Sequence, residues 1–132
     1  MRRLSWLGLA FALLLVLPAG SSSADDAITM TGEYYWEEGH NEGVLKKVIF
    51  EPTGESTWDV AFYFSFRGRD HIYRGTAEGS LTQGALAGKV RNENEERSFT
   101  FKGEFKDGTF EGEHSEVDGS SSWSTGTMVL NP

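Results

Sequence analysis

The side chains best suited to chemistry in this sequence are its three histidines, His40, His71 and His114. Imidazole can bind a transition metal, transfer protons or serve as an ordinary polar group. Glu116 lies two residues after His114, so on a β-strand both side chains would point to the same face. With His71, and with His40 as a further ligand, they could form a site suited to zinc. Because this spacing matches no established ligand motif, we predict neither a metal nor a cofactor.

Other residue types that support catalysis are present, but their spacing does not form an active site. The chain has no cysteine, and the serines at 120–122 lack the nucleophile elbow of serine hydrolases. The carboxylates within RNENEER, residues 91–97, form a run typical of a solvated loop. Glycoside hydrolysis would need two carboxylates across a cleft, and no such pair can be assigned. We therefore predict that the protein is not an enzyme.

The start of the chain has the pattern of a secretory signal peptide. The residues MRR supply a basic start, residues 4–17 form a short apolar run, and the small residues up to Ala24 suit cleavage. The apolar run is shorter than the roughly 20 residues of a transmembrane helix, so an uncleaved anchor is the less favoured alternative. We predict that the signal peptide covers residues 1–24. Residues 25–132 would form a single secreted or periplasmic domain without a membrane span.

The predicted mature domain is strongly acidic. The whole chain has a formal charge of −8, and loss of the two N-terminal arginines leaves −10 on residues 25–132. Such a surface repels polyanions, so we predict no nucleic-acid partner. Without cysteine the domain forms no disulfide and must be stabilised by its hydrophobic core.

β-Strands must position these residues, because alternation with a period of two recurs along the whole domain. The clearest case is residues 58–66, where apolar residues alternate with mostly polar ones. The apolar row consists of Trp58, Val60, Phe62, Phe64 and Phe66. The pattern predicts eight strands, over residues 28–36, 44–51, 56–67, 70–81, 85–91, 98–106, 109–116 and 123–130. Short connections favour an all-β fold, an eight-stranded antiparallel up-and-down meander that closes into a barrel. A two-sheet sandwich is the alternative.

Turn residues predict how the strands pair. Asp107-Gly108 is a hairpin signal, because a type I′ turn needs positive φ and glycine adopts it readily. It predicts three facing pairs: Phe105 and Phe110, Gly103 and Gly112, Phe101 and His114. Turns expected at 68–69 and 83–84 predict further pairs: Phe66 and His71, Phe64 and Tyr73, Phe62 and Gly75, Trp58 and Gly79, Leu81 and Leu86, Gly79 and Gly88.

Several glycines fall on the inward-facing rows of these strands. Glycine beside large aromatic residues lets a sheet coil tightly, and a small barrel needs such bends. The alternative is that glycine leaves space for a ligand. We favour bending at Gly75 and Gly79, where aromatic residues of a neighbouring strand can cover them. Gly103 and Gly112 face each other, with no aromatic cover assigned.

The connections of a meander alternate between the two ends of the barrel. One end receives short links and both termini, with links at 52–54, 82–84 and 107–108. The other end receives mostly longer, polar links, at 37–43, 67–70, 91–97 and 117–122. We therefore predict a closed end and an open end, with all three histidines near the open one. The outward rows are charged, as in KGEFK at 102–106, which favours a soluble barrel over an outer-membrane one.

This arrangement resembles the calycin-type barrels, namely lipocalins, fatty-acid-binding barrels and avidins, as an architecture over residues 27–130. The stretch GEYYW, residues 32–36, is similar to the Gly-x-Trp start of lipocalins, although Trp36 comes two positions later. The last strand lacks the arginine that lipocalins pack over that tryptophan. The chain is also similar to small secreted bacterial proteins without an assigned activity. The resemblance implies a small ligand inside the barrel and identifies no particular one.

The sequence predicts that the open end binds a small, mostly apolar ligand. The predicted ligand-binding residues come from inward rows near that end: Tyr34, Trp36, Phe64, Phe66, His71, Tyr73, Phe101 and His114. The alternative is a barrel filled with side chains, which would act as a structural or protein-interaction module of the cell envelope. The two hypotheses differ in whether a cavity of several hundred cubic ångströms lies below the open end.

Overall fold

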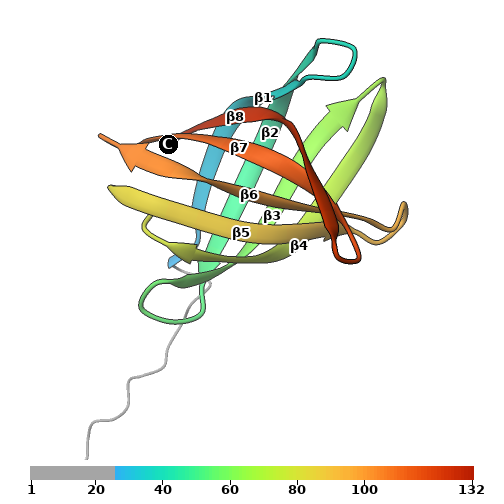
Figure 1. The fold of residues 1–132 in the computed structure, drawn as a ribbon. Coiled ribbons are helices and arrows are strands. Elements are labelled where there is room, and N and C mark those ends of the chain that lie inside the picture. Colours follow the sequence, from blue (N-terminus) through green and yellow to red (C-terminus); the bar gives the residue numbers. More distant parts are fainter. Residues whose placement is uncertain (1–25) are drawn as a thin grey trace, which may run out of the picture.

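Residues 26–132 of the computed structural model form a barrel of eight strands (Figure 1). The predicted signal peptide, residues 1–24, lies outside the described residues. In chain order the strands are β1 (Ile28–Trp36), β2 (Asn41–Pro52), β3 (Thr57–Phe66), β4 (Arg69–Gly79), β5 (Gly84–Asn92), β6 (Arg97–Lys106), β7 (Thr109–Asp118) and β8 (Ser121–Asn131). Over the described range, no helix has the length and apolar character needed to cross a membrane.

Each strand pairs antiparallel with the next one along the chain, and β8 pairs with β1 to close the sheet. The closing pair aligns Thr31 with Asn131 at one end and Trp36 with Gly126 at the other. This topology confirms the predicted all-β meander and closed barrel and excludes the two-sheet sandwich. Closure leaves no edge strand with unpaired backbone groups.

The β6–β7 hairpin has the predicted register. Asp107 and Gly108 have φ values of 55° and 86°, as a type I′ turn requires. The strands then align the three expected pairs, namely Phe105 with Phe110, Gly103 with Gly112, and Phe101 with His114.

The turn between β3 and β4 lies one residue earlier than predicted. Arg67 and Gly68 occupy it with φ values of 54° and 78°, so glycine takes the second turn position, as in the β6–β7 hairpin. The register is consequently displaced by two residues, and the expected pairs are wrong. The observed pairs are Phe66 with Arg69, Phe64 with His71, Phe62 with Tyr73, Val60 with Gly75, and Trp58 with Ala77. A displacement of two keeps every side chain on its predicted face.

The β4–β5 link is also longer than predicted and covers residues 80–83. The Ser80 hydroxyl accepts hydrogen bonds from two backbone N–H groups of this link, each at 3.1 Å. Leu81 therefore lies in the loop, where its side chain is 5% exposed and belongs to the hydrophobic core. The pairs expected from a turn at 83–84 are wrong for this reason, and the observed ones are Gly79 with Leu86 and Ala77 with Gly88.

The inward glycines lie where backbone segments approach closely. A Cβ atom on Gly103 would overlap the backbone of Glu111 and Gly112, on the adjacent strand. The ring of Phe110 lies against Gly112, so this glycine has an aromatic cover that the sequence did not assign. A Cβ atom on Gly79 would overlap the backbone of Ala85 and Leu86 on β5, and Trp58 donates a hydrogen bond from Nε1 to the Gly79 carbonyl oxygen at 3.0 Å. These contacts support the interpretation of the inward glycines as positions where the sheet bends.

The two ends of the barrel differ in how their side chains pack. Six side chains near the end with the chain termini, or midway along the barrel, are almost fully buried: Val48, Phe50, Leu86, Phe105, Phe110 and Leu130. Towards the other end the inward aromatic residues are only partly buried, among them Tyr34, Trp36, Phe64, Phe66 and Phe99. One half of the barrel is therefore filled, and the other is not packed to its rim.

The expected difference in loop length between the ends is wrong. The links at the open end cover only residues 37–40, 67–68, 93–96 and 119–120, and those at the other end cover 53–56, 80–83 and 107–108. Strand pairing continues into the polar stretches that the sequence analysis treated as loops, because hairpin hydrogen bonds satisfy their backbone groups. Side-chain packing, and not loop length, distinguishes the open end.

Candidate functional site

A cavity of about 300 Å³ occupies the incompletely packed half of the barrel and opens at the end that carries the β3–β4 and β5–β6 turns. Side chains from all eight strands and from both turns line it. The lining residues are Tyr34, Trp36, Leu45, Phe62, Phe64, Phe66, Arg67, Arg69, His71, Tyr73, Val90, Glu95, Arg97, Phe99, Thr100, Phe101, His114 and Met128.

Aromatic rings form a continuous belt around the cavity wall. Tyr34 contacts Phe64 at a centroid distance of 5.3 Å, and Phe64 stacks on Tyr73 at 5.5 Å. Tyr73 meets Phe99 at 5.5 Å, and Phe99 meets Trp36 at 5.7 Å. Edge-to-face and offset contacts of this kind are the arrangements that aromatic rings prefer. The belt makes this part of the wall apolar.

The floor of the cavity separates it from the filled half of the barrel. Phe62 and Phe101 meet edge to face with centroids 5.2 Å apart, and they are 6% and 3% exposed. Phe101 in turn contacts Phe110, one of the fully buried core residues, at 6.4 Å. A ligand in the cavity would therefore rest on the hydrophobic core.

His114 is held in the wall by three strands. Its Nδ1 lies 2.6 Å from the Thr125 hydroxyl on β8, and its Nε2 lies 3.0 Å from the carbonyl oxygen of Tyr35 on β1. Trp36 stacks on the ring at 5.8 Å with an interplanar angle of 18°. Burial lowers the pKa of His114 below its ordinary value, against the raising effect of the backbone hydrogen bonds. The imidazole is therefore neutral near pH 7, with Nε2 donating to the carbonyl.

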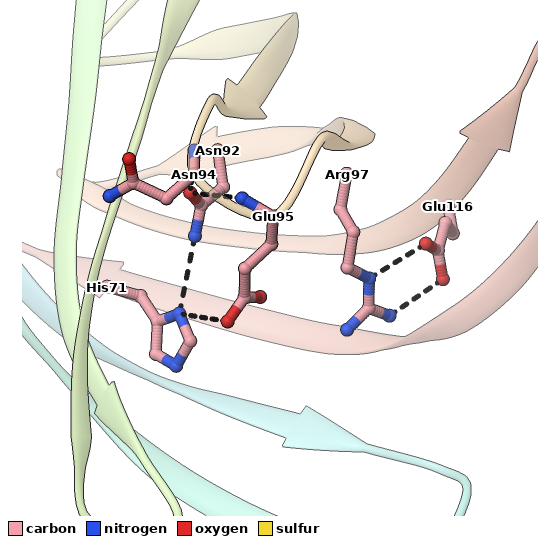
Figure 2. Close-up of polar contacts among 6 residues, drawn as sticks. All are labelled: His71, Asn92, Asn94, Glu95, Arg97 and Glu116. Atoms are coloured by element: carbon pink, nitrogen blue, oxygen red, sulfur yellow. Dashed lines mark hydrogen bonds and ion pairs between the residues drawn. The ribbon is translucent and has the colours of Figure 1, made fainter.

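Arg97 and Glu116 form a two-pronged ion pair beside the cavity (Figure 2). Nε and Nη2 of Arg97 donate to the two carboxylate oxygens at 2.9 and 2.8 Å. The guanidinium also lies over the rings of Trp36 and Phe99, at 5.6 and 5.3 Å. The hydrogen bonds to Glu116 raise the pKa of Arg97. This arginine is thus already neutralised and held in place by its neighbours.

His71 is anchored to the β5–β6 turn, as Figure 2 shows. The buried Asn92 accepts hydrogen bonds from the backbone N–H groups of Asn94 and Glu95 at 3.0 and 3.3 Å, which fixes the turn. Its side-chain nitrogen donates to Nδ1 of His71 at 3.3 Å. A carboxylate oxygen of Glu95 lies 3.6 Å from the same Nδ1 atom, beyond hydrogen-bonding distance.

The three histidines do not converge on a common point. His114 bonds to β1 and β8, His71 to Asn92 at the end of β5, and His40 to the hydroxyl of Tyr35 at 2.8 Å. Glu116, the carboxylate considered as a fourth ligand, is paired with Arg97. Within residues 26–132, no three potential ligand side chains are grouped in a way that could hold a metal ion. The metal site weighed in the sequence analysis thus has no geometric basis in the described residues.

All eight predicted ligand-binding residues line the cavity: Tyr34, Trp36, Phe64, Phe66, His71, Tyr73, Phe101 and His114. Their role as ligand contacts stays a prediction. Five further lining residues were not predicted from the sequence: the charged residues Arg67, Arg69, Glu95 and Arg97, and the belt residue Phe99. Alternation could have found Phe99 and Arg97, because they share a strand face with Phe101. Arg67 could not be found in this way, because the turn was placed one residue late.

Comparison with known proteins identifies no relative. No protein-family model matches the chain, and neither a curated protein nor a solved structure matches it significantly. The resemblance to calycin-type barrels therefore stays a prediction, and function must be argued from the cavity itself.

Proposed function

We propose that this protein binds a small, mostly apolar ligand in the cavity at the open end of its barrel. The cavity of about 300 Å³ carries this proposal. Pockets for small molecules typically range from roughly 300 to 1,000 Å³ and have apolar walls with a few placed polar groups. Here the aromatic belt supplies the walls, and the side chain of His71, which is bonded to Asn92 through Nδ1 alone, supplies a polar edge. An apolar molecule leaving water for such a cavity gains free energy roughly in proportion to its buried area.

The alternative function, a filled barrel that acts through its outer surface, has less support. The core is packed from the chain-terminal end up to Phe62 and Phe101, and packing stops there. A purely structural barrel of this size would gain stability from filling the remaining space with side chains. A cavity left open beside an aromatic wall is typical of a binding site.

We further propose that the protein is secreted or periplasmic and soluble, on the basis of the N-terminal pattern and the charged outward rows. One experiment tests location and binding together: native mass spectrometry of protein purified from its own host. We expect an intact mass that corresponds to residues 25–132, in addition to a non-covalently bound species. An unprocessed chain would contradict secretion, and a preparation without bound species would contradict ligand binding.

A matched pair of variants assigns any bound species to the cavity. Val90 lines the cavity and is 6% exposed, so Val90→Phe should fill the space without unfolding the protein. Val44 is 62% exposed on the outside of the barrel, and Val44→Phe makes the same chemical change there. We expect Val90→Phe to lower the bound fraction at least about tenfold and Val44→Phe to leave it unchanged. Equal retention by both variants would place the ligand elsewhere.

A further inference from the structure

The charged side chains that line the cavity carry more positive than negative charge. Three arginines line the cavity, Arg67, Arg69 and Arg97, whereas Glu95 is the single carboxylate among the lining residues of the described chain. The protein as a whole has a formal charge of −8. The excess of positive charge is confined to the cavity lining, because the links at this end also carry Glu37, Glu38, Glu93 and Glu96.

The three arginines differ in whether they are neutralised. Arg97 makes two short hydrogen bonds to Glu116. The ion pairs found over residues 26–132 involve Lys46, His71 and Arg97, so neither Arg67 nor Arg69 has a carboxylate partner within 4.0 Å. The nearby Asp70 forms its ion pair with Lys46 at 3.2 Å and accepts a further hydrogen bond from Ser65 at 2.7 Å, both through Oδ1.

The β3–β4 turn holds both free arginines above the aromatic belt. Arg67 occupies the first position of the type I′ turn with φ 54°, a conformation that favours asparagine, aspartate or glycine over arginine. Its guanidinium lies over the ring of Phe66 at 5.1 Å, at the rim of the cavity. Arg69 follows directly after Gly68, faces Phe66 across the hairpin and also lines the cavity. Two unpaired guanidinium groups thus flank one side of the entrance.

We propose that the ligand is an apolar molecule with one anionic group, such as a carboxylate, which Arg67 and Arg69 bind at the mouth. The apolar part would occupy the aromatic cavity. The planar guanidinium group matches a carboxylate through paired hydrogen bonds, which an ammonium or hydroxyl group on the ligand could not accept in the same way. This inference rests on the proposed function and adds the charge and orientation of the ligand.

The test uses three probes that share one hydrocarbon chain and differ only in their head group: octanoate, 1-octanol and octylammonium. Their dissociation constants for residues 25–132 would be measured by titration calorimetry at low and high salt. We expect octanoate to bind about fivefold to tenfold more tightly than 1-octanol at low salt, and octylammonium to bind least. The advantage of octanoate should shrink in about 0.5 M NaCl, because salt screens exposed charges.

Two double variants locate the effect. Arg67→Asn with Arg69→Gln removes both free arginines, and asparagine suits the positive φ of the turn. Arg74→Gln with Arg91→Gln makes the same change in net charge on the outer face, where these exposed residues lie opposite each other. We expect the first variant to lose the preference for octanoate while its affinity for 1-octanol stays within about twofold. The second should behave like the unmodified protein.

The possible outcomes separate this inference from the proposed function. If 1-octanol and octanoate bind equally, or if octylammonium binds best, the anionic preference is wrong and the apolar site remains. If the outer-face variant loses the preference as strongly as the mouth variant, overall charge is responsible and the assignment to Arg67 and Arg69 is wrong. If none of the three probes binds, the proposed function itself is contradicted.

Discussion

At the scale of single residues, His114 links the closure of the barrel to its protonation state. The Thr125 hydroxyl lies 2.6 Å from Nδ1 of His114 and 3.0 Å from the carbonyl oxygen of the same residue. A hydroxyl has one proton, so with a neutral imidazole it can donate to only one of these acceptors. Because Nε2 donates to Tyr35 on the closing strand, the ring bridges β7, β8 and β1. A change in the charge or identity of this ring should therefore alter the free energy of unfolding of the whole barrel.

We expect the free energy of unfolding to fall as the pH drops below about 6.5. Burial lowers the pKa of His114 from 6.5 in the folded state, whereas in the unfolded chain it returns to that value. At pH values between the folded and the unfolded pKa, the unfolded state binds more protons than the folded state. The contribution of the neutral His114 ring to stability is therefore fully present above pH 6.5 and is lost as the pH falls through the folded pKa. Urea unfolding of the unmodified protein and of His114→Gln at several pH values between 5 and 8 measures this dependence.

The His114→Gln variant should lose much of the pH dependence of the free energy of unfolding between pH 5 and 8. His40→Gln, which removes an exposed histidine bonded to Tyr35, is the matched control for loss of an imidazole. A dependence that His40→Gln abolishes and His114→Gln retains would show that the assignment to the buried ring is wrong.

At the scale of elements, tight hairpins and inward glycines determine how the strands curve. The β6–β7 hairpin shows this best, because its type I′ turn sets the register that brings Gly103 and Gly112 into contact. A side chain at either position would push the two backbones apart. The sheet can therefore bend sharply at this pair, next to the rings of Phe105 and Phe110, which lie 5.3 Å apart.

We expect Gly103→Ala to destabilise the protein by about 1–3 kcal/mol, because the new methyl group would overlap backbone atoms that cannot move aside independently. Gly108→Asn in the adjacent turn is the control. No atom lies within 4 Å of a Cβ built at Gly108, and asparagine tolerates the φ of 86°. Its cost should stay below about 1 kcal/mol in the same urea unfolding measurement. A larger loss in Gly108→Asn than in Gly103→Ala would contradict the role given to the glycine pair.

At the scale of the whole molecule, the barrel has a filled half and a half that contains the cavity for which we propose ligand binding. The filled half contains the most deeply buried residues, such as Phe105 at 1% exposure. In the other half Phe64 is only partly buried and lines the cavity. Removing a ring from a packed core costs both hydrophobic burial and a new cavity, whereas a ring beside an existing cavity loses fewer contacts.

We therefore expect Phe105→Ala to lower the free energy of unfolding by about 3–5 kcal/mol, and Phe64→Ala by about half as much or less. In ligand titrations we expect the reverse order, with Phe64→Ala weakening the binding of 1-octanol more than Phe105→Ala does. Urea midpoints and the titrations above provide both readouts. Equal losses of stability at the two positions would contradict the division of the barrel into a filled and a hollow half.

Local patterns in the sequence were sufficient for the topology. Alternation identified eight strands, and the Asp107-Gly108 turn predicted the pairing of Phe101 with His114, because strand period and turn geometry are properties of a few adjacent residues. The displacement at Arg67-Gly68 shows the limit of this reasoning. A glycine fits several turn positions, and only pairing along the full length of β3 and β4 selects one of them.

The inward faces of the strands, and so the set of residues able to line a cavity, followed from the sequence by itself, because side chains alternate along a strand whatever the tertiary structure is. Whether those side chains fill the barrel was decided only by the tertiary structure. The volume left below the rim depends on how eight strands curve, on how Trp36 packs against Phe99, and on how Phe64 and Phe99 pack against Tyr73. That volume is set by contacts between distant strands, which no local sequence pattern encodes. The position of the free arginines at the mouth of the cavity depends on the same contacts.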